Sequence, residues 1–466
     1  MAHGFYLQIL SNIFMATDLT QGSVSTHLRR QATPMAFGLV AIISFDAVDL
    51  FFVSRLGDMP LAAIAFCFPL IWLLTSVVIG FEAGAASVIS RAVGRKDIEA
   101  TRRQTTDTAM LAGLVLAIAV LFCYLFMDTI FGLLGATDEL MPLIHDYMSI
   151  WFWAEPLSAV CWICLASMRA RGNSMLEGQI ITLAAVLNAI LDPIMIFGMF
   201  GFPRLEIAGA ALATLTSNVI VLVGTLSYLH FKLDVFAAPF GRLASVLESW
   251  KEMLRIGLPA ILTNTVVPIA NSIAVAMIAA YGIDAVAGFG VGIRIEPMVL
   301  IPFYALSAVT SPFMGQNYAA GQLDRMLEAR KVIAKFSLAY GLSIAVVLGF
   351  AATHLAGLFS ETAEIREIAV IYLWIMAISY GGYGMVMSVC AGFNGMGFPM
   401  PAVVISVTRA LLVFLPLALL LQWLWGIQGL FIAGATSNIL IGVGAYMWFG
   451  RYIRVHRRKH GKPQLY

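Results

Sequence analysis

The sequence predicts an all-α integral membrane protein whose twelve transmembrane helices form two six-helix bundles related by pseudo-two-fold symmetry. Hydrophobic residues make up 60% of the 466 residues, charged residues make up only 12%, and the mean hydropathy is +0.89. The apolar residues occur in stretches long enough to cross about 30 Å of hydrocarbon. The sequence also repeats itself at a spacing of about 225 residues. A soluble domain would carry far more polar surface than this composition allows.

Apolar stretches bounded by charged residues, Gly or Pro indicate the individual helices. In the first half they cover 34–55, 61–91, 106–135, 142–168, 175–199 and 205–231. In the second half they cover 257–281, 285–314, 332–358, 366–392, 399–423 and 427–450. The expected organisation is therefore a cytoplasmic segment (1–33), a first bundle (34–231), a cytoplasmic linker (232–256), a second bundle (257–450) and a basic tail (451–466). The linker segment LESWKEMLRIG is expected to form an amphipathic helix.

The positive charges predict the orientation of these helices. Almost all of the 28 Lys and Arg residues fall in segments on one side, and the loops of the other side hold only Arg55, Arg204 and Arg366. The positive-inside rule therefore places both termini in the cytoplasm. Residues 5–14 are too short and lack the basic region of a cleavable signal peptide. No compact basic domain is present, so nucleic acid is not an expected partner.

The internal repeat relates the two bundles. Pro34 matches Pro259, Tyr147 matches Tyr372, and the tripeptide TSN at 216–218 matches TSN at 436–438. LGDMPLAAIAF in the first half likewise matches YGIDAVAGFGV in the second. Because each copy contains an even number of helices, both copies have the same orientation in the membrane. Parallel repeats predict two bundles with a cavity between them.

Acidic residues inside the apolar stretches are the strongest indication of function. Asp49 lies in the first helix, and Asn188 and Asp192 lie four residues apart in the fifth, so the latter two share one helix face. A carboxylate within a bilayer is costly, which makes it a candidate functional residue. Asp46, one turn before Asp49, is a secondary candidate.

The second half lacks these acids. At the repeat spacing Asp46, Asp49, Asn188 and Asp192 correspond to Asn271, Ala274, Val413 and Leu417. Acids that only held the shared fold together would be needed in both halves. The asymmetry therefore favours a function performed in the first bundle, and local hydrogen bonding of the acids is the alternative.

The first, fifth and sixth helices could present these groups to one pocket. Thr214 lies on the sixth helix, with Ala210 one turn earlier on the same face. Two carboxylates in a low-dielectric pocket cannot both ionise cheaply, so one of them is expected to take up a proton. The same oxygen atoms could hold sodium, a hard cation that prefers oxygen ligands. The residues alone do not choose between the two ions.

Other intramembrane charges are weaker candidates. Arg294 and Glu296 are two residues apart and point in different directions, so each needs a partner elsewhere. Glu296 is the stronger of the two, because Pro297 and Pro302 free backbone carbonyls near it. For Glu155, a place in the pocket and a local ion pair are equally supported interpretations. Glu82 is interpreted as a structural residue at a close helix approach, and Arg409 as a snorkelling or paired cation.

No enzyme signature is present. The sequence contains no Walker lysine motif, no HExxH and no GxSxG, and its histidines show no metal-ligand spacing. The five cysteines all lie in apolar stretches and are interpreted as small packed thiols. We therefore expect no metal and no cofactor, and no use of ATP.

Five motifs lie along the chain, namely VDLFFVSRLG, RARGNSM, NAILDP, GAALAT and MGQNYAAG. Together they resemble the motifs of the multidrug and toxic compound extrusion (MATE) transporters, specifically the DinF-type subfamily. The resemblance covers the chain from about Pro34 to Arg451. It implies a secondary active exporter in the bacterial inner membrane that moves cationic or amphipathic organic molecules against inward proton or sodium flow.

The resemblance also assigns roles to individual residues. The positions that match the family's cation- or proton-binding residues are Asp49, Tyr147, Asn188, Asp192, Ala210 and Thr214. The family's first-helix proline, whose kink is proposed to follow protonation, falls on Pro34. The chain departs from the NorM-type branch because its seventh and tenth helices carry no acid at midspan. This departure favours proton coupling in the first half.

The expected function is therefore proton-coupled export of small organic, drug-like molecules by alternating access. Sodium coupling at the same site is one alternative. Flipping of a lipid-linked glycan is another, which is weakened because only Arg294 and Arg409 could meet its phosphates. The expected partners are the substrate and membrane lipid, and we expect a monomer.

Overall fold

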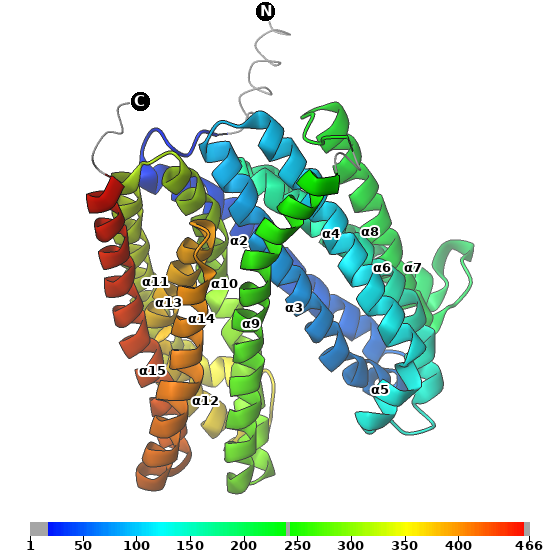
Figure 1. The fold of residues 1–466 in the computed structure, drawn as a ribbon. Coiled ribbons are helices and arrows are strands. Elements are labelled where there is room, and N and C mark those ends of the chain that lie inside the picture. The colour runs from blue at the N-terminus through cyan, green and yellow to red at the C-terminus, as the bar shows by residue number, and fades with distance from the viewer. Residues whose placement is uncertain (1–16, 239–242, 461–466) are drawn as a thin grey trace, which may run out of the picture. The chain divides into compact units, whose positions relative to one another are not determined.

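The computed structural model describes residues 17–238 and 243–460, so parts of the predicted N-terminal segment and basic tail lie outside the described residues. Helices account for nearly all of the described chain, and no strand occurs in it (Figure 1). The first half contains α2 (Val24–Ser54), α3 (Asp58–Gly94), α4 (Ile98–Leu125), α5 (Met127–Leu133), α6 (Met141–Ala170), α7 (Ser174–Phe197), η1 (Met199–Gly201) and α8 (Glu206–Phe231).

The second half begins with α9 (Leu243–Ile278), η2 (Ala279–Tyr281), α10 (Ile283–Ala319) and α11 (Leu323–Gly357). It continues with α12 (Ala363–Ala377), α13 (Tyr380–Gly395), α14 (Pro399–Val407), a π-helical turn η3 (Thr408–Val413) and α15 (Phe414–His460). Within the described residues, ten helical stretches are long and apolar enough to cross a membrane, and α12 with α13, bent by 59°, makes an eleventh.

The twelfth span comes from a break inside the last stretch. Trp425 and Gly426 have non-helical backbone angles, and Gly426 has a φ of 58°. This left-handed conformation favours glycine and divides Pro399–Arg458 into two segments. The observed architecture therefore agrees with the predicted all-helical, twelve-span fold. The predicted span 106–135 differs in detail, since it comprises α4 and the short α5.

Two helices begin well before the residues expected from sequence. α2 begins at Val24 and α9 at Leu243, so Pro34 and Pro259 lie inside helices instead of opening them. The added turns bury an apolar face, because Val24 and Met253 are fully buried. This packing compensates for the one backbone hydrogen bond that each proline removes.

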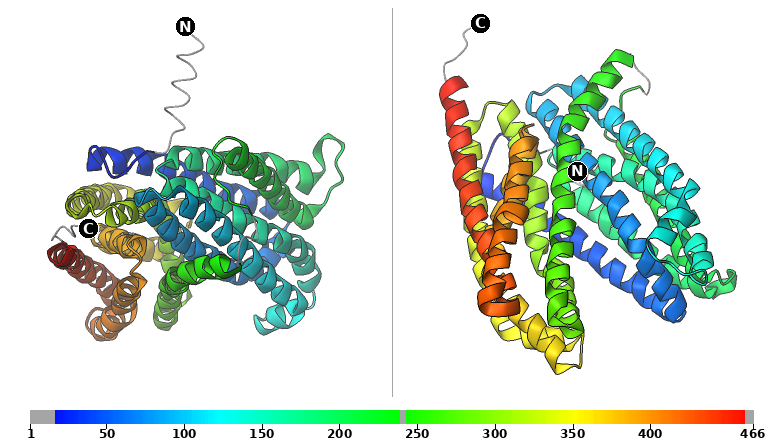
Figure 2. Two further views of the ribbon diagram at one scale, coloured as in Figure 1. Left: turned by 45° about the horizontal axis from the view of Figure 1, so that its top comes forward. Right: turned by 60° about the horizontal axis from the view of Figure 1, so that its bottom comes forward.

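The described residues form two compact units that divide at these two prolines. One unit contains Pro34–Leu258, and the other contains Leu19–Thr33 together with the chain from Pro259 onward. The predicted 232–256 linker thus belongs to the first unit. In that unit α6 packs against α3, α4 and α8, and α7 packs against α8. In the second unit α13 packs against α10, α11 and α15 (Figure 2).

Polar contacts hold each helical extension within its unit. In the first unit the indole of Trp250 donates to the Asp107 carbonyl at 2.9 Å, and Glu252 pairs with Arg91 at 3.1 Å. In the second unit Arg325 donates to the carbonyl of Gly22 at 2.6 Å and to that of Leu19 at 2.9 Å. Residues 243–258 at the start of α9 therefore belong to the first unit, and residues 24–33 at the start of α2 belong to the second.

Candidate functional site

The first unit brings four helices together around the predicted acids. Asp49 lies on α2, Tyr147 on α6, Asp192 on α7 and Thr214 on α8. Asp192 is completely buried, Tyr147 is buried, and Asp49 and Thr214 are half-buried. The carboxylates of Asp49 and Asp192 lie close enough to interact electrostatically, and Tyr147 interacts with both. These contacts join residues far apart in the sequence at one place in the bundle.

A hydrogen-bond chain links α7 to α8 at this place. In the orientation that its neighbours favour, the Asn188 amide donates to the two Asp192 carboxylate oxygens at 2.9 and 3.0 Å. Its oxygen accepts from the Thr214 hydroxyl and from the Thr214 backbone N–H, both at 3.2 Å. The Thr214 hydroxyl also lies 3.2 Å from the Ala210 carbonyl oxygen. Asn188 therefore holds the Asp192 carboxylate in place from the neighbouring turn.

Asp49 differs from Asp192 because one of its oxygens is left without a partner. Oδ1 of Asp49 is buried and makes no hydrogen bond within the described residues. A buried polar atom without a partner is costly, and a bound proton or cation would remove that cost. Asp46 is exposed one turn earlier and interacts electrostatically with Asp49. Glu155 is buried on α6, and no hydrogen bond or ion pair of the described residues joins it to the two acids.

Pro34 lies at a close crossing of α2 and α7. A Cβ atom built on Gly178 would lie 2.4 Å from the Pro34 carbonyl oxygen, and one on Gly38 would lie 3.3 Å from the Gly178 Cα. Glycine at both positions permits this approach. α2 is helical on both sides of Pro34, so the predicted hinge position is a proline within a continuous helix.

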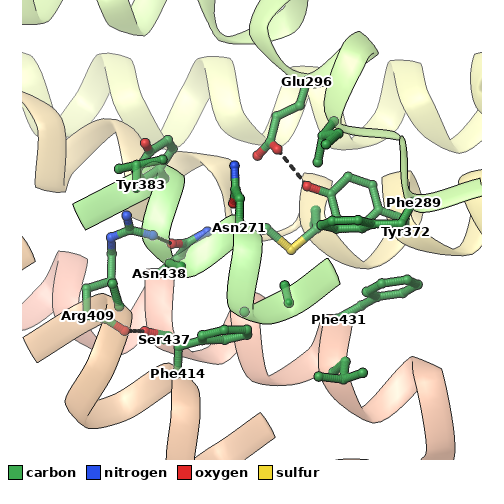
Figure 3. Close-up of a pocket in the computed structure, with 18 of the residues that line it drawn as sticks. Asn271, Phe289, Glu296, Tyr372, Tyr383, Arg409, Phe414, Phe431, Ser437 and Asn438 are labelled. Atoms are coloured by element: carbon green, nitrogen blue, oxygen red, sulfur yellow. Dashed lines mark hydrogen bonds between the residues drawn. The ribbon is translucent and has the colours of Figure 1, made fainter. Parts of the chain in front are cut away.

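The second unit contains a cavity of about 170 Å³, lined by apolar residues and a few polar ones, that the sequence analysis did not predict (Figure 3). Glu296 on α10 and Arg409 on the π-helical turn η3 both line it. The Tyr372 hydroxyl donates to Glu296 at 2.6 Å, and Arg409 donates to the Asn438 side-chain oxygen at 3.0 Å. The second half therefore has a half-buried carboxylate on α10, which is not the repeat counterpart of α2 or α7, the helices that carry Asp49 and Asp192.

The cavity places Arg409 among protein side chains, which favours a paired cation over a snorkelling one. Its guanidinium lies 4.8 Å from the centre of the Tyr383 ring, and its Nε is buried without a hydrogen-bond partner in the described residues. Arg294, by contrast, is exposed and does not line the cavity. The expectation that Arg294 and Glu296 point in different directions is confirmed.

A buried ionic cluster in the first unit was also missed. Arg169 at the end of α6 pairs with Glu82 of α3 and with Glu177 of α7. Arg169 and Glu177 are buried, and Glu82 is nearly so. The sequence analysis assigned Glu82 to close packing and did not single out Glu177. The RARGNSM motif was the signal that could have pointed to this cluster.

Comparison with known proteins identifies the family. The MatE family model matches residues 34–194 and 259–420, so the two matches begin at Pro34 and Pro259, the positions that the internal repeat pairs. An FAD transporter of Shewanella oneidensis is 35% identical over 432 residues, covering 92% of this chain and 95% of that protein. The multidrug export protein MepA of Staphylococcus aureus is 26% identical over 421 residues, covering 89% and 91% of the two chains.

Solved structures agree with this assignment. The Vibrio cholerae MATE transporter VcmN in its bent form is 28% identical, with a TM-score of 0.89 over 93% of this chain and 98% of that one. A mutant of the same transporter gives a TM-score of 0.88 at the same identity, over 93% and 97% of the two chains. The family match spans both halves of the chain, and the multi-pass helical fold is the one found in these transporters. The chain therefore belongs to the MATE family of membrane transporters.

Proposed function

We propose that this protein is a DinF-type, proton-driven exporter of organic molecules, with Asp49 and Asp192 as the proton-binding pair. The single observation that carries the proposal is the buried, unpartnered Oδ1 of Asp49 beside the carboxylate of Asp192. Such an oxygen is a ready acceptor for a proton, because protonation removes both the unmet hydrogen bond and the repulsion between the two acids.

The proposed cycle uses the residues around this pair. A proton from the outside binds the Asp49 and Asp192 pair in the outward-facing state and removes the repulsion between the two carboxylates. The bonds that Asn188 makes to Asp192 and to Thr214 then rearrange. α2 bends near Pro34, where Gly38 and Gly178 permit its close approach to α7, and substrate is released to the outside. The proton is released on the cytoplasmic side after the bundles change orientation, which completes alternating access.

Efflux from proteoliposomes under separately imposed proton and sodium gradients tests this function. We expect the proton gradient alone to drive efflux, and Asp49→Asn to reduce it about 5- to 150-fold, the range of a coupling free energy. Asp138→Asn removes an exposed acid and is the matched control. Full efflux with unaltered pH dependence in Asp49→Asn would contradict the proposal. Efflux driven only by sodium would establish sodium as the coupling ion.

The substrate has two candidate classes. Drug-like cationic or amphipathic molecules follow from the multidrug export relatives, and FAD follows from the 35% identical transporter. The Arg409 cation in the second-unit cavity favours the second class, because FAD carries aromatic rings and anionic phosphates. Loading the same proteoliposomes with either ethidium or FAD distinguishes them. A lipid-linked glycan receives the least support, because Arg294 is exposed and leaves Arg409 alone to meet its phosphates.

A further inference from the structure

We infer that the second-unit cavity is a ligand subsite for a planar aromatic ring that carries an acidic group at one end and an N–H donor at the other. This inference deepens the proposed function, on which it rests for the direction of transport, by naming the chemistry of the substrate. The three parts of the ligand follow from three features of the cavity, namely its cation, its carboxylate and its aromatic wall.

Arg409 provides the site for the acidic group. Its guanidinium donates to Asn438, its Nε has no partner, and no carboxylate of the described residues lies within ion-pair distance. A buried guanidinium normally pairs with an anion, often through two parallel hydrogen bonds. An acidic group on a ligand would supply the anion that the protein does not provide.

The local backbone directs Arg409 into the cavity. Arg409 lies in the π-helical turn η3, and such turns occur often at functional sites. The Ser437 hydroxyl donates to the Arg409 carbonyl at 2.6 Å and so supports this turn. The repeat pairs Arg409 with Ala184, whose carbonyl accepts from Ser217 at 3.1 Å within the regular helix α7. Both bundles therefore have a serine hydroxyl that donates to the carbonyl at this position, whereas the π-helical turn and the arginine are features of the second bundle.

Glu296 provides the site for the N–H donor. One of its oxygens accepts from Tyr372 at 2.6 Å, which leaves the other free to accept from a ligand. Figure 3 shows Glu296 and Arg409 at separate ends of the lining, with Asn271 between them. A ligand that met both charges would therefore need its acidic group and its N–H donor at opposite ends.

Aromatic side chains form part of the lining, and Figure 3 shows Phe289, Tyr372 and Phe431 on its Glu296 side. The ring centres of Phe289 and Phe431 are 6.2 Å apart in a stacked arrangement, and the ring of Tyr372 lies edge-on to both at 5.3 and 5.2 Å. Faces and edges of this kind pack well against a further ring. A cavity of about 150 Å³ accommodates a benzene-sized ligand. The volume of about 170 Å³ therefore fits one or two fused rings, and the rest of a larger substrate would extend beyond it.

Three small probes separate the contributions of the acidic group and of the N–H donor to the binding affinity. Indole-5-carboxylate carries both groups, indole-5-carboxamide lacks the charge, and benzofuran-5-carboxylate lacks the N–H donor. Binding of tritiated indole-5-carboxylate to the purified protein in lipid nanodiscs is measured in competition with the other two. A charge-assisted hydrogen bond is worth about 1.5–3 kcal/mol, so the carboxylate is expected to bind about ten- to hundredfold tighter than the carboxamide. Equal affinities of the carboxylate and the carboxamide would overturn the inference.

Variants then assign each preference to a residue. Arg409→Gln should abolish the preference for the carboxylate, and Arg409→Lys should retain part of it. Glu296→Gln should reduce the preference for indole over benzofuran and leave the preference for the carboxylate intact. Arg294→Gln, which removes an exposed cation outside the cavity, is the control and should bind like the wild type. A carboxylate preference that survives in a monodisperse Arg409→Gln protein would contradict the inference. The comparison of probes on the wild type requires no variant to fold.

Asp49→Asn separates this inference from the proposed function. It should bind indole-5-carboxylate normally and show the reduced proton-driven efflux expected above. A wild-type protein that binds the probe but shows no proton-driven efflux would leave the subsite intact and refute the proposed coupling.

Discussion

The two bundles share a fold but place their buried charges at different positions. The first bundle has Asp49 and Asp192 where the second has Ala274 and Leu417. The second bundle has Glu296 and Arg409 where the first has Ile71 and Ala184. The duplicated scaffold therefore tolerates charge at several helix positions, and each copy uses a different pair. One copy holds two acids together, which suits a proton, and the other holds an acid and a base, which suits an organic ligand.

The tyrosine that the repeat retains shows how one position serves both sites. Tyr147 interacts electrostatically with Asp49 and Asp192 in the first bundle, and Tyr372 donates to Glu296 in the second. In each case the phenol lies beside the acid of its own bundle, although the acids come from different helices. The cavity thus contains a tyrosine that both halves of the repeat share, and the charged residues around this tyrosine differ between the two bundles.

The largest expected effect comes from the ionic cluster of the first bundle, whose paired positions in the second bundle carry no charge. The repeat pairs Arg169, Glu82 and Glu177 with Asn394, Ser307 and Ala402. Arg169→Asn gives the first bundle the residue of the second and leaves two buried carboxylates without their cation. Breaking a buried ion pair in this way costs about 3–5 kcal/mol. Thermal unfolding of the detergent-solubilised protein, followed by fluorescence-detected size exclusion, measures the loss.

An exposed ion pair is the control for this experiment. Arg204→Gln removes the partner of Glu206, whose 3.4 Å contact is exposed on both sides. We expect a change of about 0–1 kcal/mol, as for other surface pairs. Equal unfolding temperatures for Arg169→Asn and Arg204→Gln would show that the buried cluster does not stabilise the first bundle.

The next largest effect should distinguish the two tyrosines. Tyr372→Phe leaves Glu296 without its 2.6 Å hydrogen bond and is expected to cost about 1.5–3 kcal/mol, as for other bonds to charged groups. Tyr147 makes no hydrogen bond through its hydroxyl within the described residues, so Tyr147→Phe should change the unfolding free energy by about 0.5 kcal/mol or less. The same unfolding assay compares them. A larger cost for Tyr147→Phe would reverse the assignment of the two sites.

A smaller effect is expected at the helix crossing of the first bundle. Gly178→Ala places a Cβ atom 2.4 Å from the Pro34 carbonyl oxygen, and overpacking of this kind costs about 1–3 kcal/mol. The repeat pairs Gly178 with Val403, so the second bundle does not require this close approach. Gly224→Ala is the matched control, because Gly224 faces open space in α8 and Ala should stabilise the helix by about 0.5–1 kcal/mol. Opposite shifts of the unfolding temperature are therefore expected, and equal shifts would argue against a tight contact.

The sequence predicted the number of spans well because the bilayer fixes their length and requires every backbone group to be satisfied. It predicted the starts of α2 and α9 poorly, because proline was expected to open a helix. Buried apolar residues such as Val24 and Met253 extend both helices past that point. Only the packed structure shows that these turns have a surface to bury against.

The two candidate sites also differ in how far the sequence predicts them. The pair Asn188 and Asp192 could be predicted because their four-residue spacing places them on one face and their absence from the second half is visible in the repeat. The cavity of Glu296 and Arg409 could not, because these residues lie on separate helices and nothing in their spacing along the chain places them together. The π-turn that orients Arg409 has no marker in the sequence. Local spacing was therefore informative, whereas a contact between distant helices was not.

The smallest expected effect concerns a serine hydrogen bond that both bundles retain between corresponding helices. Ser217→Ala removes the bond to the Ala184 carbonyl, and Ser437→Ala removes the bond to the Arg409 carbonyl. Each loss should cost about 0.5–1.5 kcal/mol in the unfolding assay. Only Ser437→Ala should also weaken binding of indole-5-carboxylate, because only its partner lies in the π-turn that orients a cation. If Ser217→Ala weakened binding as much, the effect would come from general loosening of the helices, and the π-turn would have no special role in placing Arg409.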